Sequence, residues 1–206
     1  AGAGGPPQTL CDAEGDTLSG SWNQDDVILF EQRGSLHRVG SGGGVSAPVR
    51  TPDKAKNDVS YKWPSFLPDG RHFLYLAVNS QAGRTEVRSG ALDSKEDKPL
   101  FAVSSRVLYV EPGYLLFVRD GTLMAQPFDG QNLSLTGDLF PVAERIAYNG
   151  TNGNAAFSVS ANGSLVYRTS GTAQTELAWL DRTGKKLSVV PATGNSPLNP
   201  YLSPDQ

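Results

Sequence analysis

The strongest constraint on the fold is one short turn between two apolar runs, which recurs along the chain. In "WPSFLPDGRHFLYL" (residues 63–76), Pro-Asp-Gly separates two such runs. Proline presets φ, and Asp-Gly supplies the positive φ that a tight hairpin requires. The equivalent turns lie about 43 to 50 residues apart, which is the period of four-stranded propeller blades. The turn positions are Asp26, Gly70, Gly113, Gly163 and Gln206.

Each repeat reads as four strands in the same order. After the turn, "HFLYLAV" is apolar on both faces, which is typical of a strand covered on both sides. A more polar strand, "TEVRSGALD", follows, and "KPLFAVS" reads as the fourth. We find no capping box followed by helical periodicity, and a β-sandwich would not need one unit copied four times. The sequence therefore predicts an all-β fold: a β-propeller of four-stranded antiparallel blades, about four complete, with partial terminal blades.

We interpret residues 1–206 as a single propeller domain and expect it to be a piece of a longer protein. The first partial unit, 6–13, reads as the closing strand of a preceding blade, and the last, 200–206, as the start of a further one. The complete units are predicted at 18–51, 63–104, 106–146 and 156–191.

Composition excludes several classes of function. The net charge is -3 and no run of like charge occurs, which argues against nucleic acid as the main partner. One cysteine, Cys11, allows neither an internal disulfide nor a multi-cysteine metal site. The longest apolar run, residues 73–78, is too short to cross a bilayer, so we expect no membrane insertion. No signal peptide is visible in "AGAGGPPQTL", and any export signal is expected outside this sequence.

The turns carry a family resemblance. "FLPDGRHFLYL" and "YLSPDQ" resemble the TolB-like, WD-repeat-like β-propellers of bacteria, and "FSVSANGSLVY" is similar more loosely. "GYLLFVRDGTLMAQPFD" and "LAWLDRTGK" look like the propeller that follows the kinase domain in some bacterial receptor-like Ser/Thr protein kinases. The resemblance covers essentially the whole chain and is specific for architecture, since the family is defined by its turns rather than by a site.

The resemblance implies a periplasmic or cell-envelope location. The sequence departs from the family at Gln206, where a glycine is expected. Rings of this family usually have six or more blades, so four and a half would leave open edges. Such edges favour either closure as a small ring or self-association.

Glycine-rich segments, histidines and paired acidic residues can serve in catalytic or binding sites, but here they occur in patterns that favour structural roles. "GSGGG" (40–44) lacks the Lys-Ser/Thr of a phosphate loop, and His37-Arg38 has no following Asp as a kinase loop would. No Gly-x-Ser-x-Gly elbow occurs, and His72 begins a strand directly after a turn. The acid pairs 25–26 and 96–97 fall at predicted turns. We predict no catalytic, cofactor or metal site in this chain.

The tryptophans and the cysteine are interpreted in the same way. Trp22 and Trp63 hold equivalent places in two repeats, which favours packing between adjacent blades over ligand stacking. Cys11 is predicted to fill space in a closing strand.

Binding is expected on loops that join one repeat to the next. Three such segments, 51–62, 147–155 and 191–200, are long and polar and should emerge on one face near the channel. They suit a protein, peptide or cell-envelope ligand, and they could equally be solvated loops. The candidate residues are Lys62, Trp63, Tyr148, Asn154 and Asn199.

Three functions stay open at this point. The first is a non-catalytic interaction or sensor module. The second is an accessory domain of a larger enzyme, either the sensor end of a receptor-like Ser/Thr kinase or the gating propeller of a serine peptidase. A glycan-acting or lactone-acting propeller enzyme is the third, and it has no support in the residues.

Overall fold

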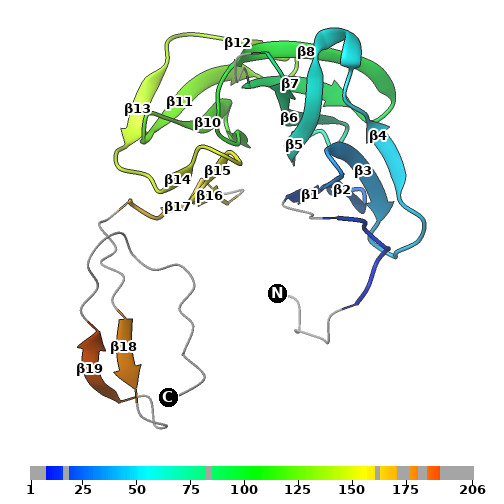
Figure 1. The fold of residues 1–206 in the computed structure, drawn as a ribbon. Helices are drawn as coiled ribbons and strands as arrows, with labels where there is room; N and C mark the ends of the chain where they lie inside the picture. Colours follow the sequence, from blue (N-terminus) through cyan, green and yellow to red (C-terminus); the bar gives the residue numbers. More distant parts are fainter. Residues whose placement is uncertain are drawn as a thin grey trace. The chain divides into compact units, whose positions relative to one another are not determined.

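The computed structural model describes residues 8–15, 19–81, 85–160, 163–170, 177–180 and 185–190. Its regular elements are β-strands apart from one short 3-10 helix, η1 (Lys54–Lys56). The chain divides into two compact units, residues 1–169 and 170–206. Figure 1 shows the strands of both units.

Two four-stranded antiparallel sheets begin unit 1, each with its strands in sequence order. The strands of the first sheet are β1 (Gly20–Trp22), β2 (Val27–Gln32), β3 (Ser35–Gly40) and β4 (Ala47–Arg50). The strands of the second are β5 (Asp58–Phe66), β6 (His72–Asn79), β7 (Thr85–Ala91) and β8 (Ser94–Ala102).

The third sheet repeats the order with one addition. Its main strands are β9 (Leu108–Val110), β10 (Tyr114–Arg119), β11 (Thr122–Asp129) and β13 (Phe140–Ala143). Short strand β12 (Ser134–Leu135) pairs with the far end of β11. Two hairpins complete unit 1: β14 (Tyr148–Asn149) with β15 (Asn154–Ala155), and β16 (Phe157–Val159) with β17 (Leu165–Tyr167). In unit 2, β18 (Leu177–Leu180) pairs with β19 (Lys186–Val190).

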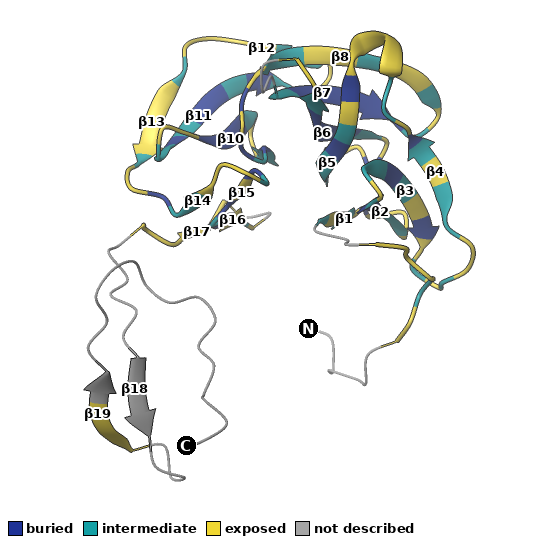
Figure 2. Ribbon diagram, in the orientation of Figure 1, coloured by how far each residue is buried: buried dark blue, intermediate teal, exposed yellow. Residues whose placement is uncertain are grey.

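The second strands of the second and third sheets, β6 and β10, each contribute side chains to two of the core clusters. In β6, Phe73, Tyr75 and Ala77 pack in one cluster with Leu29 and Leu36 of the first sheet. The alternate residues of β6 pack with side chains of the third sheet, namely Leu115, Phe117 and Phe128. Figure 2 shows buried residues along β6 and β10. This two-sided burial confirms the strand pattern read from "HFLYLAV" and the prediction of an all-β propeller with four-stranded antiparallel blades.

The first strands of consecutive sheets, β1, β5, β9 and β16, pack one against the next. The turns that follow them have the backbone predicted from the sequence. Asp26, Gly70, Gly113 and Gly163 have φ of 61°, 68°, 149° and 82°. All four values lie in the positive range that the tight turns were expected to need.

Two segments predicted to be polar loops contain regular structure. Strand β5 already begins at Asp58, so the last part of segment 51–62 is strand. Segment 147–155 holds the β14–β15 hairpin. Residues 8–15 carry no strand, and the backbone N–H of Gly44 donates to the Leu10 carbonyl. The predicted boundaries of the units stay predictions, and segments 191–200 and 200–206 lie outside the described residues.

Candidate functional site

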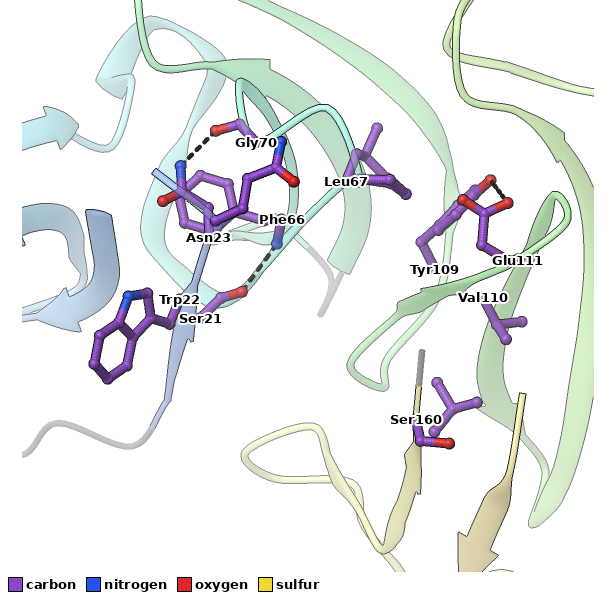
Figure 3. Close-up of a pocket in the computed structure, with 13 residues that line it drawn as sticks. Ser21, Trp22, Asn23, Phe66, Leu67, Gly70, Tyr109, Val110, Glu111 and Ser160 are labelled. Carbon is purple, nitrogen blue, oxygen red and sulfur yellow. Dashed lines mark hydrogen bonds between the residues drawn. The ribbon is translucent and has the colours of Figure 1, made fainter. Parts of the chain in front are cut away.

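The turns after the first strands surround a hollow of about 370 Å³. We call this side of unit 1 the turn face and define it by residues 23–26, 67–71 and 111–113, with Ser160. Four consecutive repeats contribute to the hollow, which we call the central hollow (Figure 3). Its wall combines the apolar side chains of Leu67, Val110 and Val159 with polar groups. The polar side chains are those of Ser21, Asn23, Gln24, Tyr109, Glu111 and Ser160.

Cross-links between the first two repeats shape one wall. The Asn23 side-chain amide donates to the Gly70 carbonyl at 2.6 Å. Its oxygen accepts from the N–H groups of Asp25 and Val27 at 3.1 and 2.8 Å, which holds the first turn. Ser21 Oγ accepts from the N–H of Phe66 at 3.0 Å and ties β1 to β5. Figure 3 shows the bonds between the two repeats. These bonds place the two turns in fixed register.

The positive φ of Gly70 requires a glycine in this turn. A Cβ at Gly70 would lie 2.8 Å from Asp25 Oδ2, closer than carbon and oxygen normally approach. Asp25 is exposed and this oxygen ends a flexible side chain that can move aside, so the φ of 68° is what requires glycine here.

The third repeat supplies a carboxylate to the wall. The Tyr109 hydroxyl donates to Glu111 Oε2 at 3.3 Å. Burial raises the pKa of Tyr109, and the neighbouring Glu111 carboxylate adds to this effect through its charge and its hydrogen bond. The hydroxyl thus stays protonated and orients the Glu111 carboxylate at the edge of the hollow.

A second hollow of about 550 Å³ adjoins the first and shares Leu67, Pro68, Tyr109 and Glu111 with it. We call it the side hollow. It extends over Phe128 toward the turn that follows β11, where Asp129, Gly130 and Gln131 line it. Glu111 therefore stands in the wall common to both hollows.

A chain of polar contacts borders the side hollow. His72 Nδ1 bonds with Asp69 Oδ2, and Arg71 Nη1 lies 3.0 Å from His72 Nε2. Since arginine only donates, Nε2 is the acceptor and Nδ1 carries the proton. Arg71 Nε also pairs with Asp93 at 2.8 Å. Burial raises the pKa of Asp69, but the bonds from His72 and the Arg71 N–H outweigh it and hold that pKa below its usual value.

The described residues predicted for binding do not line the central hollow: Lys62 and Trp63 lie in the middle of β5, and Tyr148 and Asn154 lie on the β14–β15 hairpin. The Trp63 indole N–H donates to the Asn152 carbonyl at 2.7 Å, and the Tyr148 hydroxyl donates to the Ser104 carbonyl at 2.8 Å. Both side chains thus hold the β14–β15 hairpin against the second repeat. Asn154 is exposed and Lys62 is half-buried on β5. Asn199 lies outside the described residues, and binding by these five residues stays a prediction.

The two tryptophans differ in their surroundings. Trp63 packs beside the core and under the Arg106 guanidinium, 5.8 Å from its ring. Trp22 is 61% exposed on the three-residue strand β1, so the predicted packing between blades is wrong for Trp22 in unit 1. Within its sheet, in the described part of the chain, β1 pairs only with β2, and the Ser21–Phe66 hydrogen bond ties it to β5.

Sequence reasoning named Trp22 and Gly70 but did not predict the central hollow. Five of its residues lie on β1, β9 and β16, which have three residues each and are too short for a periodic pattern, and most of the others lie in the turns. The available signal was positional, because each lies next to a turn of the repeat. Among the residues that the structure describes, no group of three His, Cys, Asp or Glu side chains could hold a metal ion. The described part also has no helix long and apolar enough to cross a membrane.

Comparisons with known proteins identify the architecture. No protein-family model matches the sequence, and no curated protein matches it. Among solved structures, TolB from Acinetobacter baumannii is 23% identical, with a TM-score of 0.50 over 84% of this chain and 43% of that chain. A protein of unknown function from Bacteroides caccae is 13% identical, with a TM-score of 0.47 over 86% of this chain and 61% of that one.

A third match is the β-propeller domain of the Trilobed protease from Pyrococcus furiosus. It is 11% identical, with a TM-score of 0.46, and the match covers 64% of this chain and 44% of that chain. The chain thus spans between 43% and 61% of the length of the three structures. Together with the antiparallel four-stranded sheets and the turns of the repeat, the likeness to TolB identifies the fold of this chain as a TolB-like β-propeller.

Proposed function

We propose that this propeller is a non-catalytic interaction module, which binds an extended segment of a partner protein at the turn face. One observation carries the proposal: four consecutive repeats contribute equivalent positions to a single hollow. Binding sites in proteins are commonly concave, with apolar walls and a few polar groups that fix orientation. The central hollow has this composition, and the loops of a rigid scaffold surround it.

Several polar groups of the hollow are held in place by hydrogen bonds within the chain. Ser21 Oγ and the Asn23 side chain already hold neighbouring turns, and Ser160 Oγ accepts from the N–H of Ser164 at 3.0 Å. A wall built this way is preorganised, so an incoming peptide does not have to order it. An extended peptide places alternate side chains on opposite sides, and one set can enter the central and side hollows.

Selection from a random heptapeptide library displayed on phage tests the proposal. Enriched peptides would be synthesised with a fluorophore and their affinity measured by fluorescence polarisation. Gln24 is exposed in the wall of the central hollow, so Gln24→Trp should obstruct it and weaken binding by about tenfold or more.

Gln81 is an exposed glutamine after β6, at the other end of the strands, and Gln81→Trp is the matched control. It should bind like the unaltered chain. Failure to enrich any peptide, or equal affinity of the Gln24→Trp variant and the unaltered chain, would contradict the proposal.

The accessory-domain hypothesis concerns the longer protein expected from the sequence. The kinase-like resemblance supports a sensor domain, and a peptide-binding turn face would serve that role equally well. The same family resemblance is the basis for proposing a cell-envelope location. Sequencing the complete gene decides this point, through a kinase signature or a nucleophile elbow outside the 206 residues.

A further inference from the structure

Asp25 and Asp26 of the turn face line neither hollow, and the carboxylates in or beside the wall of the side hollow differ in their partners. Asp69 bonds with His72, and Asp93 pairs with Arg71. Asp129 accepts from the N–H groups of Gln131 and Asn132 at 2.8 and 3.0 Å and from the Asn132 side-chain amide at 2.6 Å. Each of these three carboxylates is thus engaged within the chain.

Glu111 is placed differently. Its one hydrogen-bond partner in the described part of the chain is the Tyr109 hydroxyl, which binds Oε2. No lysine, arginine or histidine of the described ranges lies within ion-pair distance of it. Glu111 nevertheless stands in the wall between the two hollows, where Figure 3 shows its carboxylate beside Tyr109.

Occupation of the two hollows has a consequence for this carboxylate. A segment that crosses from one hollow to the other displaces water from Glu111. A desolvated carboxylate without a counter-charge is strongly unfavourable, whereas a cation that replaces the water offsets this cost. Glu111 is an exposed residue, so part of its hydration can remain, and a ligand that brings a positive charge to this point should bind better than a neutral one.

We propose, on the basis of the function proposed above, that the bound segment is cationic and places a lysine or arginine side chain against Glu111. The surroundings suit both parts of such a side chain. Leu67, Pro68 and Val110 offer apolar surface to its aliphatic stem. The Tyr109 ring beside the carboxylate offers a face for the cationic group.

The test uses the enriched heptapeptides and replaces each position in turn. One position should require Lys or Arg, and norleucine there, which keeps the stem without the charge, should weaken binding by about five- to twentyfold. On the Glu111→Gln variant, the lysine and norleucine peptides should bind alike. Glutamine retains an oxygen that can accept from Tyr109, so this variant removes the charge with little change of shape.

Glu144→Gln is the matched control, since Glu144 is exposed just after β13 at the opposite end of the sheet. It should preserve the preference for lysine. Raising the salt concentration from about 0.05 to about 0.5 M should weaken the binding of the lysine peptide more than that of the norleucine peptide.

The results separate the two proposals. If the Gln24→Trp change weakens peptide binding, but the peptides bind equally well with norleucine in place of lysine, the proposal of a cationic ligand is wrong. The proposed binding function would then still stand. Absence of any peptide sensitive to Gln24→Trp would overturn both. The norleucine comparison uses the unaltered chain and therefore decides the matter even if a variant fails to fold.

Discussion

The buried ion pair of the second repeat offers a sharp test of how this blade is held together. Asp58, at the start of β5, has a side chain with 0% exposure, and Arg88 on β7 has 6%. Arg88 Nη1 and Nη2 donate to the two Asp58 oxygens at 2.7 and 3.0 Å. The Tyr61 hydroxyl donates to the same carboxylate at 2.8 Å, and Arg88 Nε donates to Glu86 at 2.6 Å.

Asp58→Asn keeps the shape of this site and removes its charge. Loss of one partner from a buried pair costs about 3 to 5 kcal/mol, because the other charge remains buried. Glu86 and Asp97 still face Arg88, so we expect the lower value, about 3 kcal/mol of the free energy of unfolding. With a urea dependence of about 2 kcal/mol/M, the midpoint should fall by about 1.5 M.

Urea unfolding at neutral pH, followed by tryptophan fluorescence, measures this shift. The double variant Asp58→Leu, Arg88→Met replaces both charges by apolar groups. Its loss of unfolding free energy should be smaller, by at least about 2 kcal/mol, than the summed losses of Asp58→Leu and Arg88→Met measured singly. A loss below about 0.5 kcal/mol for Asp58→Asn, or additive single effects, would refute the reasoning. In that event the pair would not be desolvated in solution.

Three further predictions concern other parts of unit 1. Arg50 Nη2 donates to the carbonyls of Ala91, Ser94 and Glu96 at 3.1, 2.6 and 3.1 Å, and its guanidinium lies 5.6 Å from the Phe73 ring centroid. Arg50→Met should therefore lower the free energy of unfolding by about 2 kcal/mol, measured by urea unfolding. An unchanged urea midpoint would show that the link between the first two repeats is dispensable. Gly113→Ala should destabilise more than Gly121→Ala, because both have positive φ but only a Cβ at residue 113 would lie 2.9 Å from a backbone atom, the Phe128 carbonyl oxygen. Equal thermal unfolding midpoints of these two variants would show that the close contact of the added Cβ does not lower stability. Burial, together with the bond to Asp58, raises the pKa of Tyr61 to about 12. The folded chain thus holds this proton more tightly than the unfolded chain, whose tyrosine has a pKa near 10. Stability should fall as the pH rises from about 10 to about 12, with a smaller slope in Tyr61→Phe; the same slope in both chains would exclude Tyr61 as the cause.

The architecture could be read from the sequence because its signals are local. Gly70 and Gly113 take the positive φ that their turns require, and the apolar run in β6 is buried on both faces as its composition indicates. These features depend on neighbours within a few residues. The likeness to a TolB-like propeller rests on the same turns and agrees with the structural match.

The polar residues could not be placed in the same way, because their partners are distant in the chain. Segment 51–62 reads as a polar loop, yet Asp58 lies buried at the start of β5, where Arg88, thirty residues later, compensates its charge. Asn23 reaches Gly70 across 47 residues, and Trp63 reaches Asn152 across 89. A single sequence does not reveal such pairs, and this is why reasoning from loop polarity favoured the face that contains Trp63 and Tyr148.

The location of the bound segment is the central claim, and photo-crosslinking measures it most directly. An enriched heptapeptide with benzoylphenylalanine at one end would be irradiated with the chain and the attachment sites identified by mass spectrometry. We predict attachment in the walls of the central and side hollows, within residues 22–24, 67–70 and 109–112. Attachment around Lys62, Tyr148 and Asn154 would contradict this claim and support the opposite face that the sequence predicted.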